Sequence, residues 1–469
     1  MHLIWFRNDL RLHDHAALWH AAQSRQCLAL VILSPEQWQM HQDAPIKIDF
    51  YLCRLKILKQ QLEALNIPLL ILNIPLWKDI SEQLLALCQQ FQISTVHCNI
   101  ETGLNEQQRD QAVEQLLQQH RISCEYYEDR TLFPLGSIRN QSQQPYQVFS
   151  AFKKKCYERL LIDVPSCYPD IEVQPKQAID ISQFDLNAFA QNYQQETANP
   201  YWPVEDKHAF ELLNEFIADQ LKDYKTDRDF PAIDGTSQLS PYLNIGILSI
   251  RECVQALFAS SQGYFQLEDV GQQTWLDELL WREFYQHTLH DFPKVSRHQP
   301  FKENTKAIEW RDAPEDLTAW QQGRTGIPIV DAGMRQLLAT GWMHNRVRMI
   351  TAMFLSKNLL IDWRLGEAWF MQHLIDGDLA ANNGGWQWCA STGMDAAPYF
   401  RIFNPVNQSQ RFDPNGDYIR EWVPELAHLD AKTIHEPYAK NPDLGLDYPK
   451  PIVDLKSSRA RAIEVFKQI

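Results

Sequence analysis

The sequence predicts an N-terminal α/β domain with a doubly wound parallel sheet, followed by an all-α domain. Short apolar runs alternate with stretches of helical periodicity over the first 130 residues, and after Tyr201 the periodicity becomes mainly helical. Alternating strands and helices are typical of a parallel sheet with helices on both faces. A chain of 469 residues is also too long for one hydrophobic core, which favours two or three domains.

Five runs of apolar, β-branched and aromatic residues predict the strands of the first domain. They cover residues 3–6, 28–33, 69–74, 95–98 and 123–127. The stretches between them predict helices over residues 12–22, 46–65, 81–91 and 105–120. Only Gly103 and Gly136, of 17 glycines, precede residue 230. A Rossmann pyrophosphate turn needs several glycines, so this domain is not expected to hold a dinucleotide in that way.

Residues 131–200 are rich in Gln, Pro, Asp and Asn and predict a long connector. The predicted domain bounds are therefore 1–130, 131–200 and 201–469. Beyond the connector, Ser240 before Pro241 predicts a helix start with serine as N-cap, and Ser249 with Glu252 predicts a capping box. Further helices are predicted over residues 272–290, 329–339, 345–360 and 367–374.

Composition excludes several classes of protein. Nine cysteines without a C-x-x-C pair indicate reduced thiols and a cytoplasmic protein. Arg7 and Asp9 interrupt the N-terminus, which is therefore not a signal peptide, and no apolar run approaches the roughly 18 residues of a membrane span. A net charge of −15 argues against DNA binding over the whole surface. A local basic patch is still compatible with it, because residues 335–364 carry five basic residues and one acid.

The stretch from residue 376 to 405 places carboxylates and amides beside large aromatic residues. Asp376, Asp378, Asn382 and Asn383 are followed by two tryptophans, with two glycines between them. Buried polar groups need partners, because leaving one unpaired costs about 1–3 kcal/mol. A large planar ligand with polar edges satisfies both residue types, and an aromatic core with a glycine turn is the alternative. Ten of the 15 tryptophans lie between residues 275 and 422, which suits ring stacking or electron transfer as well as packing.

Other patterns permit a functional and a structural interpretation. Residues 236–240 (TSQLS) precede a predicted helix and suit an anion, although such caps are common. On the next helix one face mixes aromatic rings with charge: Trp275, Glu278, Trp281 or Arg282, and Tyr285. Glu278 and Arg282 also fit a surface ion pair. Arg346 is a candidate to bind a phosphate, and the alternative is an ordinary charged residue at the end of a helix. His287 and His290 have no third ligand nearby, so no metal is expected.

Five segments, in order along nearly the whole chain, resemble the photolyase/cryptochrome family, and within it bacterial cyclobutane pyrimidine dimer photolyases. They are WFRNDLRLHDHAAL, DFPAIDGTSQLSPYL, WLDELLWREFYQH, GWMHNRVRMITAMFLSKNLLIDWR and DGDLAANNGGWQWCASTGMDAAPYFRIFNP. The resemblance implies an antenna-binding α/β domain and an all-α FAD-binding domain that holds a U-shaped FAD. It also implies a monomeric lyase that repairs UV-damaged DNA: light drives an electron from reduced FAD to the dimer, which splits and returns it.

The resemblance also implies roles for individual residues. FAD would be held by Tyr224, Thr236, Ser237, Gln238, Leu239, Ser240, Trp275, Arg282, Asn345, Arg348, Asp376, Asp378 and Asn382, with Asn382 opposite the flavin N5. The lesion would meet Glu278, Asn345 and Met349, with Trp281 and Trp388 against the flipped pair. DNA phosphates would meet Arg228, Arg346 and Arg401. Electrons that reduce FAD would pass through Trp310, Trp363 and Trp386.

The antenna is expected to be 5,10-methenyltetrahydrofolate, bound through His41, Asn105 and Glu106. Arg297 stands where the folate-binding type usually has lysine, which keeps the charge and changes the geometry. Two relatives compete with the dimer-repair assignment. Cryptochromes typically have Asp or Cys in place of Asn382 and a long tail, which is not expected after Ile469. The (6-4) photolyases typically have a His pair where this chain has Met343-His344-Asn345-Arg346. A flavoprotein unrelated to DNA would leave the basic patch unexplained.

Overall fold

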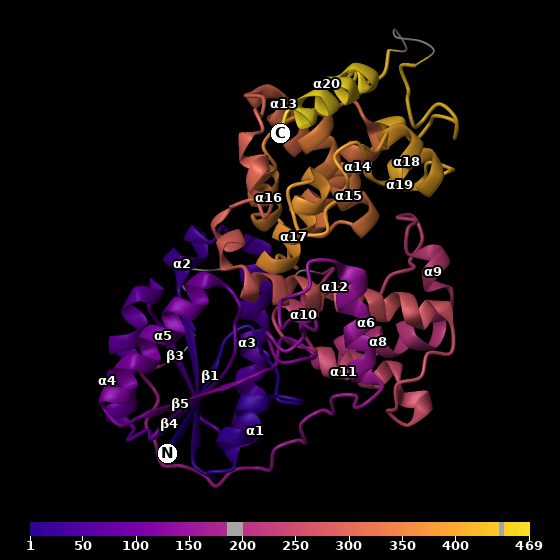
Figure 1. The fold of residues 1–469 in the computed structure, drawn as a ribbon. Helices are drawn as coiled ribbons and strands as arrows, with labels where there is room; N and C mark the ends of the chain where they lie inside the picture. Colours follow the sequence, from indigo (N-terminus) through magenta and orange to yellow (C-terminus); the bar gives the residue numbers. More distant parts are fainter. Residues whose placement is uncertain (185–199, 440–444) are drawn as a thin grey trace. The chain divides into compact units, whose positions relative to one another are not determined.

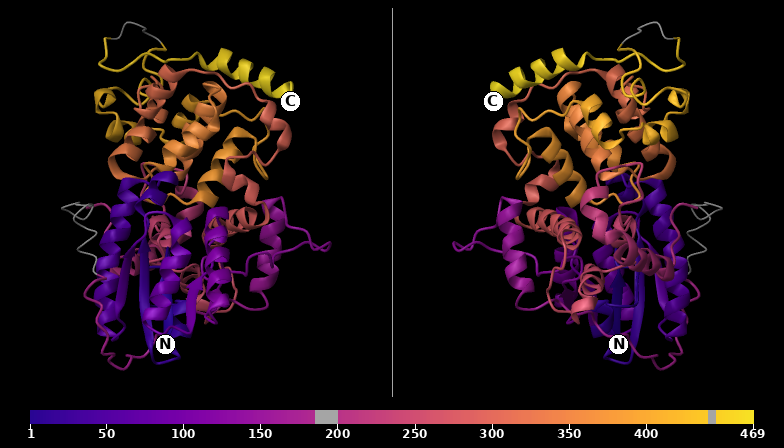
Figure 2. Two further views of the ribbon diagram at one scale, coloured as in Figure 1. Left: turned by 90° about the vertical axis from the view of Figure 1, so that its left-hand side faces the viewer. Right: turned by 90° about the vertical axis from the view of Figure 1, so that its right-hand side faces the viewer.

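The computed structural model describes residues 1–184, 200–439 and 445–469, and these form two compact units. Unit 1 comprises Met1–Tyr146, Ser150–Leu221 and Ser237–Pro293. Unit 2 comprises Gln147–Phe149, Lys222–Thr236 and Lys294–Ile469. Figures 1 and 2 show that unit 1 combines a sheet with helices, while unit 2 is helical. The predicted fold class is confirmed, whereas the predicted domain bounds stay a prediction.

The sheet of unit 1 has five parallel strands in the order β3-β2-β1-β4-β5. The strands are β1 (His2–Phe6), β2 (Cys27–Leu33), β3 (Leu69–Asn73), β4 (Thr95–Asn99) and β5 (Ser123–Tyr127). All five predicted strands are present within one residue at each end. The order reverses between β1 and β4, the doubly wound arrangement expected from the sequence.

Helices cover both faces of the sheet (Figure 1). Ile4 and Phe6 of β1 pack on one side with α1 (Ala16–Ala22) and α3 (Pro45–Ala64). Leu3 and Trp5 pack on the other side with α4 (Ile80–Gln90) and α5 (Leu104–Gln119). Successive strand residues point to opposite faces, so both cores draw on the same strands. Helix α1 begins four residues later than predicted, because the His15 side chain accepts a hydrogen bond from Leu18 N and caps it there. Helix α2 (Pro35–Met40) was not predicted.

The rest of unit 1 is mainly helical. Helix α6 (Phe149–Leu160) lies inside the predicted connector, where buried Phe152, Cys156 and Leu160 recur every fourth residue. Residues 185–199 of that connector lie outside the described residues. The other helices are α8 (Asp206–Glu215), α10 (Ser240–Asn244), α11 (Ile250–Leu257) and α12 (Val270–Asp291). The capping box of Ser249 and Glu252 is confirmed. The prediction of Ser240 as N-cap is wrong, because Leu239 before it already has helical dihedral angles (φ −82°, ψ −6°).

A buried ionic network joins the sheet region of unit 1 to α11. Asp129 accepts hydrogen bonds from Arg11 (2.6 Å) and Arg251 (2.8 Å). Asp14 accepts from the Ser249 hydroxyl (2.5 Å) and from Arg251 Nε (2.9 Å). Burial opposes ionisation of Asp129, but Arg11 and Arg251 outweigh it and hold the pKa of that carboxyl far below its usual range. Every charge of the network is matched within the protein, as burial requires.

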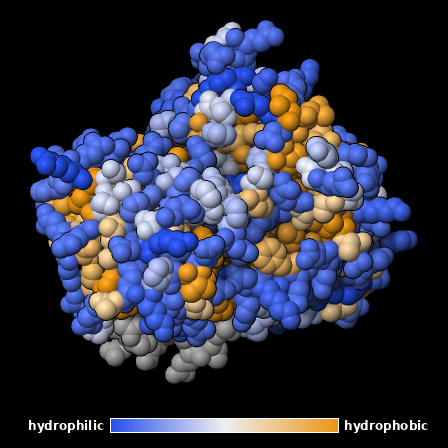
Figure 3. All heavy atoms as spheres, turned by 90° about the horizontal axis from the view of Figure 1, so that it is seen from below, coloured by the Kyte–Doolittle hydropathy of each residue, from blue (hydrophilic) through white to orange (hydrophobic). Residues whose placement is uncertain are grey.

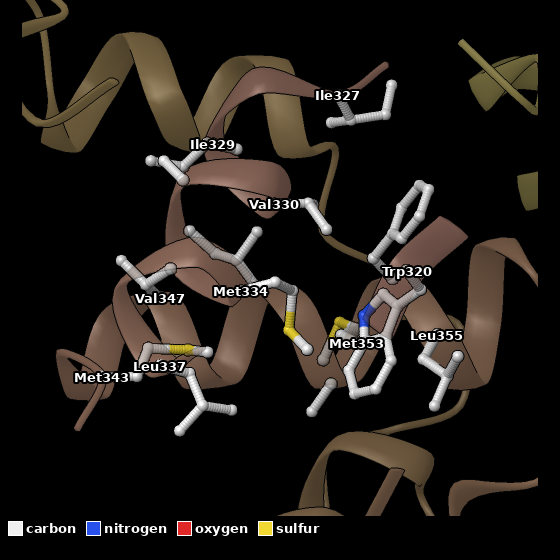
Figure 4. Packing of buried hydrophobic residues seen from close by; sticks show 14 of the residues in the cluster. Trp320, Ile327, Ile329, Val330, Met334, Leu337, Met343, Val347, Met353 and Leu355 are labelled. Carbon is white, nitrogen blue, oxygen red and sulfur yellow. The ribbon is translucent and has the colours of Figure 1, made fainter. Parts of the chain in front are cut away.

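Unit 2 is a set of helices around one core. They are α9 (Tyr224–Asp227), α13 (Pro314–Gln321), α14 (Pro328–Thr340), α15 (Asn345–Met353), α16 (Trp363–Met371), α17 (Leu379–Ala390), α18 (Pro405–Phe412), α19 (Asp417–Trp422) and α20 (Leu455–Lys467). Figure 4 shows Met334 and Leu337 of α14 close to Val347 and Met353 of α15, with Trp320 beside them. Helix α15 ends seven residues before the predicted end, because residues 354–358 form a wider π-helical turn.

The surface carries scattered hydrophobic residues. The face in Figure 3 shows apolar residues interrupted by hydrophilic ones. Among the described residues, no helix is both long and apolar enough to cross a lipid bilayer.

Candidate functional site

The polar residues at the start of α17 are fixed by neighbouring side chains of unit 2. Asp378 caps the helix, because its carboxylate accepts a hydrogen bond from Ala381 N (2.9 Å). Arg348 of α15 donates from Nη2 to Asp376 (2.8 Å) and from Nε to the Met343 carbonyl (2.7 Å). The sequence placed Asp376, Asp378 and Arg348 in one site, and the structure brings Asp376 and Arg348 into direct contact.

Glu367 of α16 orients the two asparagines, a role that the sequence analysis missed. The Asn382 amide donates to the Glu367 carbonyl oxygen (3.0 Å), and the Asn383 amide donates to the Glu367 carboxylate (2.8 Å). Gln387 donates in turn to the Asn383 side-chain oxygen (2.8 Å). The Asn382 NH₂ group is therefore engaged within the protein, which fixes the direction of its carbonyl oxygen. The only signal in the sequence is one acid in the apolar stretch WRLGEAWFM.

Helix α12 of unit 1 carries the predicted mixed stripe. Trp275 is buried against Phe216, with ring centroids 5.2 Å apart. Glu278, Trp281, Arg282 and Tyr285 are partly exposed, between positions that are mostly buried. Arg282 donates to the Arg130 carbonyl (2.6 Å), and the Trp281 ring lies 5.6 Å from that of Tyr285. The helix thus presents a polar and aromatic stripe beside a largely buried face.

The predicted phosphate-binding segment is divided between the units. Thr236 belongs to unit 2, whereas Ser237, Gln238, Leu239 and Ser240 belong to unit 1. Gln238 has a left-handed backbone (φ 49°), which turns the chain before α10 begins. Tyr224, in unit 2, is buried beneath the Arg228 guanidinium, which lies 5.3 Å from its ring centroid.

Two of the three predicted DNA-contacting arginines share one acidic neighbour. The Asp229 carboxylate lies 2.8 Å from Arg346 Nη2 and 3.9 Å from Arg228 Nε. Arg346 also covers the Phe412 ring at 4.4 Å. Arg346 is thus paired with a carboxylate that the sequence did not predict as part of the site, although Asp229 directly follows Arg228. The third arginine, Arg401, is exposed in the loop before α18.

Asn345 and Met349 belong to α15, and Trp388 belongs to α17. Asn345 is exposed at the first position of its helix, and Met349 is partly buried against the core of unit 2. Trp388 packs against the same core. These residues and the α12 stripe belong to different units.

The three predicted relay tryptophans all belong to unit 2 and differ in exposure. Trp386 and Trp363 are buried, and Trp310 is partly exposed. Trp386 packs edge-on against Phe370 (5.0 Å) and Trp320 (6.0 Å), while Trp310 packs edge-on against Phe466 of α20 (6.2 Å). All three belong to one core or pack against it.

Three of the four predicted antenna residues gather in unit 1. His41 and Asn105 are 2.9 Å apart through their side-chain nitrogens, and the His41 ring meets Trp77 edge-on at 4.8 Å. Glu106 folds back over Gly103 at the start of α5, and burial raises its pKa to about 7. Arg297 belongs to unit 2. Among the described residues, no group of three or more His, Cys, Asp or Glu side chains is placed to hold a metal ion.

Comparison with known proteins places the chain in a family. Residues 2–171 match the model described as DNA photolyase, and residues 275–468 match the FAD binding domain of DNA photolyase. The chain is 45% identical to the deoxyribodipyrimidine photo-lyase of Salmonella typhimurium, over 99% of this chain and 98% of the relative. The chain belongs to the DNA photolyase family. The photolyase of Escherichia coli is 43% identical over the same shares of the two chains.

Solved structures agree with this photolyase assignment. A bacterial class III photolyase from Agrobacterium tumefaciens superposes with a TM-score of 0.83 and 32% identity, covering 100% of this chain and 97% of that one. A Synechocystis cryptochrome superposes with a TM-score of 0.87 and 29% identity, covering 99% and 98%. Photolyases and cryptochromes thus share this fold.

Proposed function

We infer that this protein is a light-dependent DNA repair enzyme, a carbon–carbon lyase that splits cyclobutane pyrimidine dimers with FAD as its cofactor. One observation carries the inference: relatives that are 43–45% identical over 98–99% of both chains are named deoxyribodipyrimidine photo-lyase. The match to the FAD binding domain of DNA photolyase supports the cofactor.

The polar groups of unit 2 fit a flavin. The hydrogen bond from Asn382 to the Glu367 carbonyl holds a neutral amide in a fixed orientation, and Arg348 holds Asp376. Such fixed polar groups suit the hydrogen-bonding edge of a planar ring system. When bound, reduced FAD supplies the electron that light transfers to the dimer. We propose that Tyr224, Thr236, Ser237, Gln238, Leu239, Ser240, Trp275 and Arg282 complete the site, together with Asn345 and Asp378.

The lesion is proposed to meet the α12 stripe and α15. Glu278 would accept or donate a hydrogen bond to a flipped thymine, and Asn345 and Met349 are also proposed to contact the lesion. Trp281 and Trp388 would pack against the flipped pair. A damaged pair is poorly stacked and costs less to flip, which gives selectivity for the lesion. We propose that the protein acts on DNA as a monomer, with phosphates at Arg228, Arg346 and Arg401.

The antenna is proposed to be 5,10-methenyltetrahydrofolate, at His41, Asn105, Glu106 and Arg297. The support is the contact of His41 with Asn105, beside the partly exposed Trp77. A cytoplasmic location is proposed from the cysteines, all nine of which are free thiols.

The decisive experiment combines a spectrum with a repair assay. The purified protein is expected to show flavin absorption. Illumination of the reduced protein with dimer-containing oligothymidylate should restore thymine absorbance, and protein kept in the dark should not. Flavin absorption without light-dependent repair would favour a light sensor, as the likeness to a cryptochrome allows. Absence of flavin after reconstitution with FAD would contradict the proposal as a whole.

A further inference from the structure

A carboxylate occupies the space between two predicted phosphate-binding arginines of unit 2. Asp229 lies 2.8 Å from Arg346 Nη2 and 3.9 Å from Arg228 Nε. The side chains of Arg346 and Arg228 are only 17% and 16% exposed, while that of Asp229 is 32% exposed. Asp229 is therefore the most accessible member of the group, and an incoming anion meets it as soon as it approaches the two guanidinium groups.

The surroundings hold Arg346 in place independently of Asp229. Its guanidinium lies over the Phe412 ring of α18, and its backbone N–H donates to the His344 ring (3.2 Å). Phe230, which follows Asp229, packs edge-on against the same Phe412 (6.1 Å). The two arginines and the loop that carries Asp229 thus form one small cluster. Removing the carboxylate leaves the stacking on Phe412 intact.

The charges around this cluster favour an anion. Burial, together with the charges of Arg346, Arg348 and Arg228, lowers the pKa of His344 to about 4 against the opposing effect of Asp229, so this histidine is neutral at pH 7. Asp376 neutralises Arg348. Asp229 is the carboxylate that the remaining two arginines share. A carboxylate and a phosphate bind a guanidinium through the same pair of oxygen acceptors, so they compete for one position.

We propose that Asp229 occupies the position of a DNA phosphate between Arg228 and Arg346 and thereby weakens the part of DNA binding that does not depend on damage. The inference rests on the proposed function, since it assumes that DNA is the partner. Contacts to phosphate carry no sequence or damage information. Because the Asp229 carboxylate competes with phosphate, it lowers the affinity that comes from phosphate contacts and leaves recognition of the flipped lesion unchanged. It also speeds release of repaired product.

The test is Asp229→Asn, compared with Asp223→Asn as a matched control. Asp223 is exposed in the same segment, and its substitution gives the same change of net charge. Binding is measured on a duplex with one thymine dimer and on the undamaged duplex, over a range of salt concentrations. Asp229→Asn should bind both duplexes about fivefold more tightly near physiological salt. Its plot of log K against log salt should steepen by about 0.9, because one more counterion is released. Asp223→Asn should show neither change, since its effect is long-range and screened.

Two further variants exclude indirect effects. Asp229→Glu keeps the charge and should bind as the parent does. In a background of Arg346→Gln, Asp229→Asn should lose most of its effect, because its main partner is gone. Flavin absorption and the melting temperature establish that each variant is folded. If folded Asp229→Asn binds no more tightly than Asp223→Asn, the proposal is overturned.

The same variants separate this proposal from the proposed function. Single-turnover repair of bound dimer should be equal in the parent and Asp229→Asn. Multiple-turnover repair in the presence of excess undamaged DNA at low salt should be slower in Asp229→Asn. Parental protein that neither binds nor repairs dimer DNA would refute the proposed function. Normal parental repair with unchanged binding by Asp229→Asn would refute the role of Asp229 alone.

Discussion

Asn382, which is proposed to lie opposite the flavin N5, is held in one orientation by its neighbours. Its NH₂ group is held by the Glu367 carbonyl, so Asn382→Asp loses a donor and sets a carboxylate against that oxygen. The same carboxylate would face an anionic reduced flavin. We expect reduced Asn382→Asp to reoxidise in air at least several times faster than the parent, since an unmade buried hydrogen bond costs about 1–3 kcal/mol. Flavin absorbance after mixing with air measures the rate; equal rates, with neutral Asn382→Ser as a comparison, would contradict this role.

Glu278 is partly exposed next to the buried Leu279 and Leu280 of α12, which suits a group that meets substrate. Glu278→Ala should keep FAD and lose a large part of the repair per absorbed photon, because a hydrogen bond counts for more in a pocket of low dielectric constant. The yield is measured with reduced protein at saturating dimer. Glu278→Gln keeps the shape of the side chain and removes its charge, so its repair yield shows which of the two properties repair requires. An unchanged yield in Glu278→Ala would exclude a part in repair.

Lys357 is a buried residue whose titration should affect stability. It is fully buried in the π-helical turn, donates to the Ser391 hydroxyl (2.9 Å) and lies over the Phe466 ring. Burial lowers its pKa to about 6. Between about pH 6 and the ordinary lysine value near 10.4, the unfolded chain binds a proton that the folded chain does not, so stability rises with pH. Below pH 6 both states bind the proton and this contribution to stability is lost.

Lys357→Met should therefore reduce the slope of unfolding free energy against pH by about 1.4 kcal/mol per pH unit between pH 7 and 9. Urea unfolding of the parent and the variant at several pH values measures it. Lys302→Met, at an exposed lysine, is the control and should change the slope less. Identical slopes for Lys357→Met and the parent would mean that Lys357 is charged when folded.

At the scale of elements, α16 and α17 approach closely through one glycine. A Cβ on Gly366 would lie 2.1 Å from the Trp386 ring and 2.6 Å from Leu355. Gly366→Ala should lower the unfolding free energy by about 1–3 kcal/mol through overpacking. Gly385→Ala on α17 is the matched control, because no atom lies within 4 Å of its Cβ. It should raise stability by about 0.5–1 kcal/mol through helix propensity. Urea unfolding distinguishes the two, and equal effects would contradict the close approach.

At the scale of the whole molecule, the core of unit 2 is proposed to conduct electrons as well as to stabilise the fold. Trp310→Phe should fold and bind FAD, since it keeps most of the apolar contact with Phe466. Its oxidised flavin should be photoreduced at least several times more slowly with an external reductant, because phenylalanine is much harder to oxidise. Chemically reduced variant should still repair dimers. Photoreduction at the parental rate would exclude an essential relay through Trp310, and loss of repair after chemical reduction would show a different role.

Sequence patterns predicted the sheet well, because its strands are short apolar runs bounded by polar residues. They predicted helix ends less well: α1 begins at a histidine cap, and α15 ends in a π-helical turn, and neither leaves a distinct periodicity. The residues of the candidate site were predicted from motifs that this sequence shares with the photolyase/cryptochrome family. Glu367 and Asp229 were missed because their roles depend on contacts between segments distant in sequence, such as Asp229 with Arg346.

The buried network around Asp129 determines whether the N-terminal region can be separated from the rest of the chain. If residues 1–130 were excised, Asp14 and Asp129 would lose Arg251 of α11 and Ser249, the N-cap of that helix, which lie more than a hundred residues later in the chain. Breaking a buried ion pair on one side costs about 3–5 kcal/mol, a large part of the stability of a domain. Residues 1–130 are therefore not a separable domain: transferring them to another protein, or exchanging them between relatives, requires that the acceptor supply its own arginine to those two aspartates.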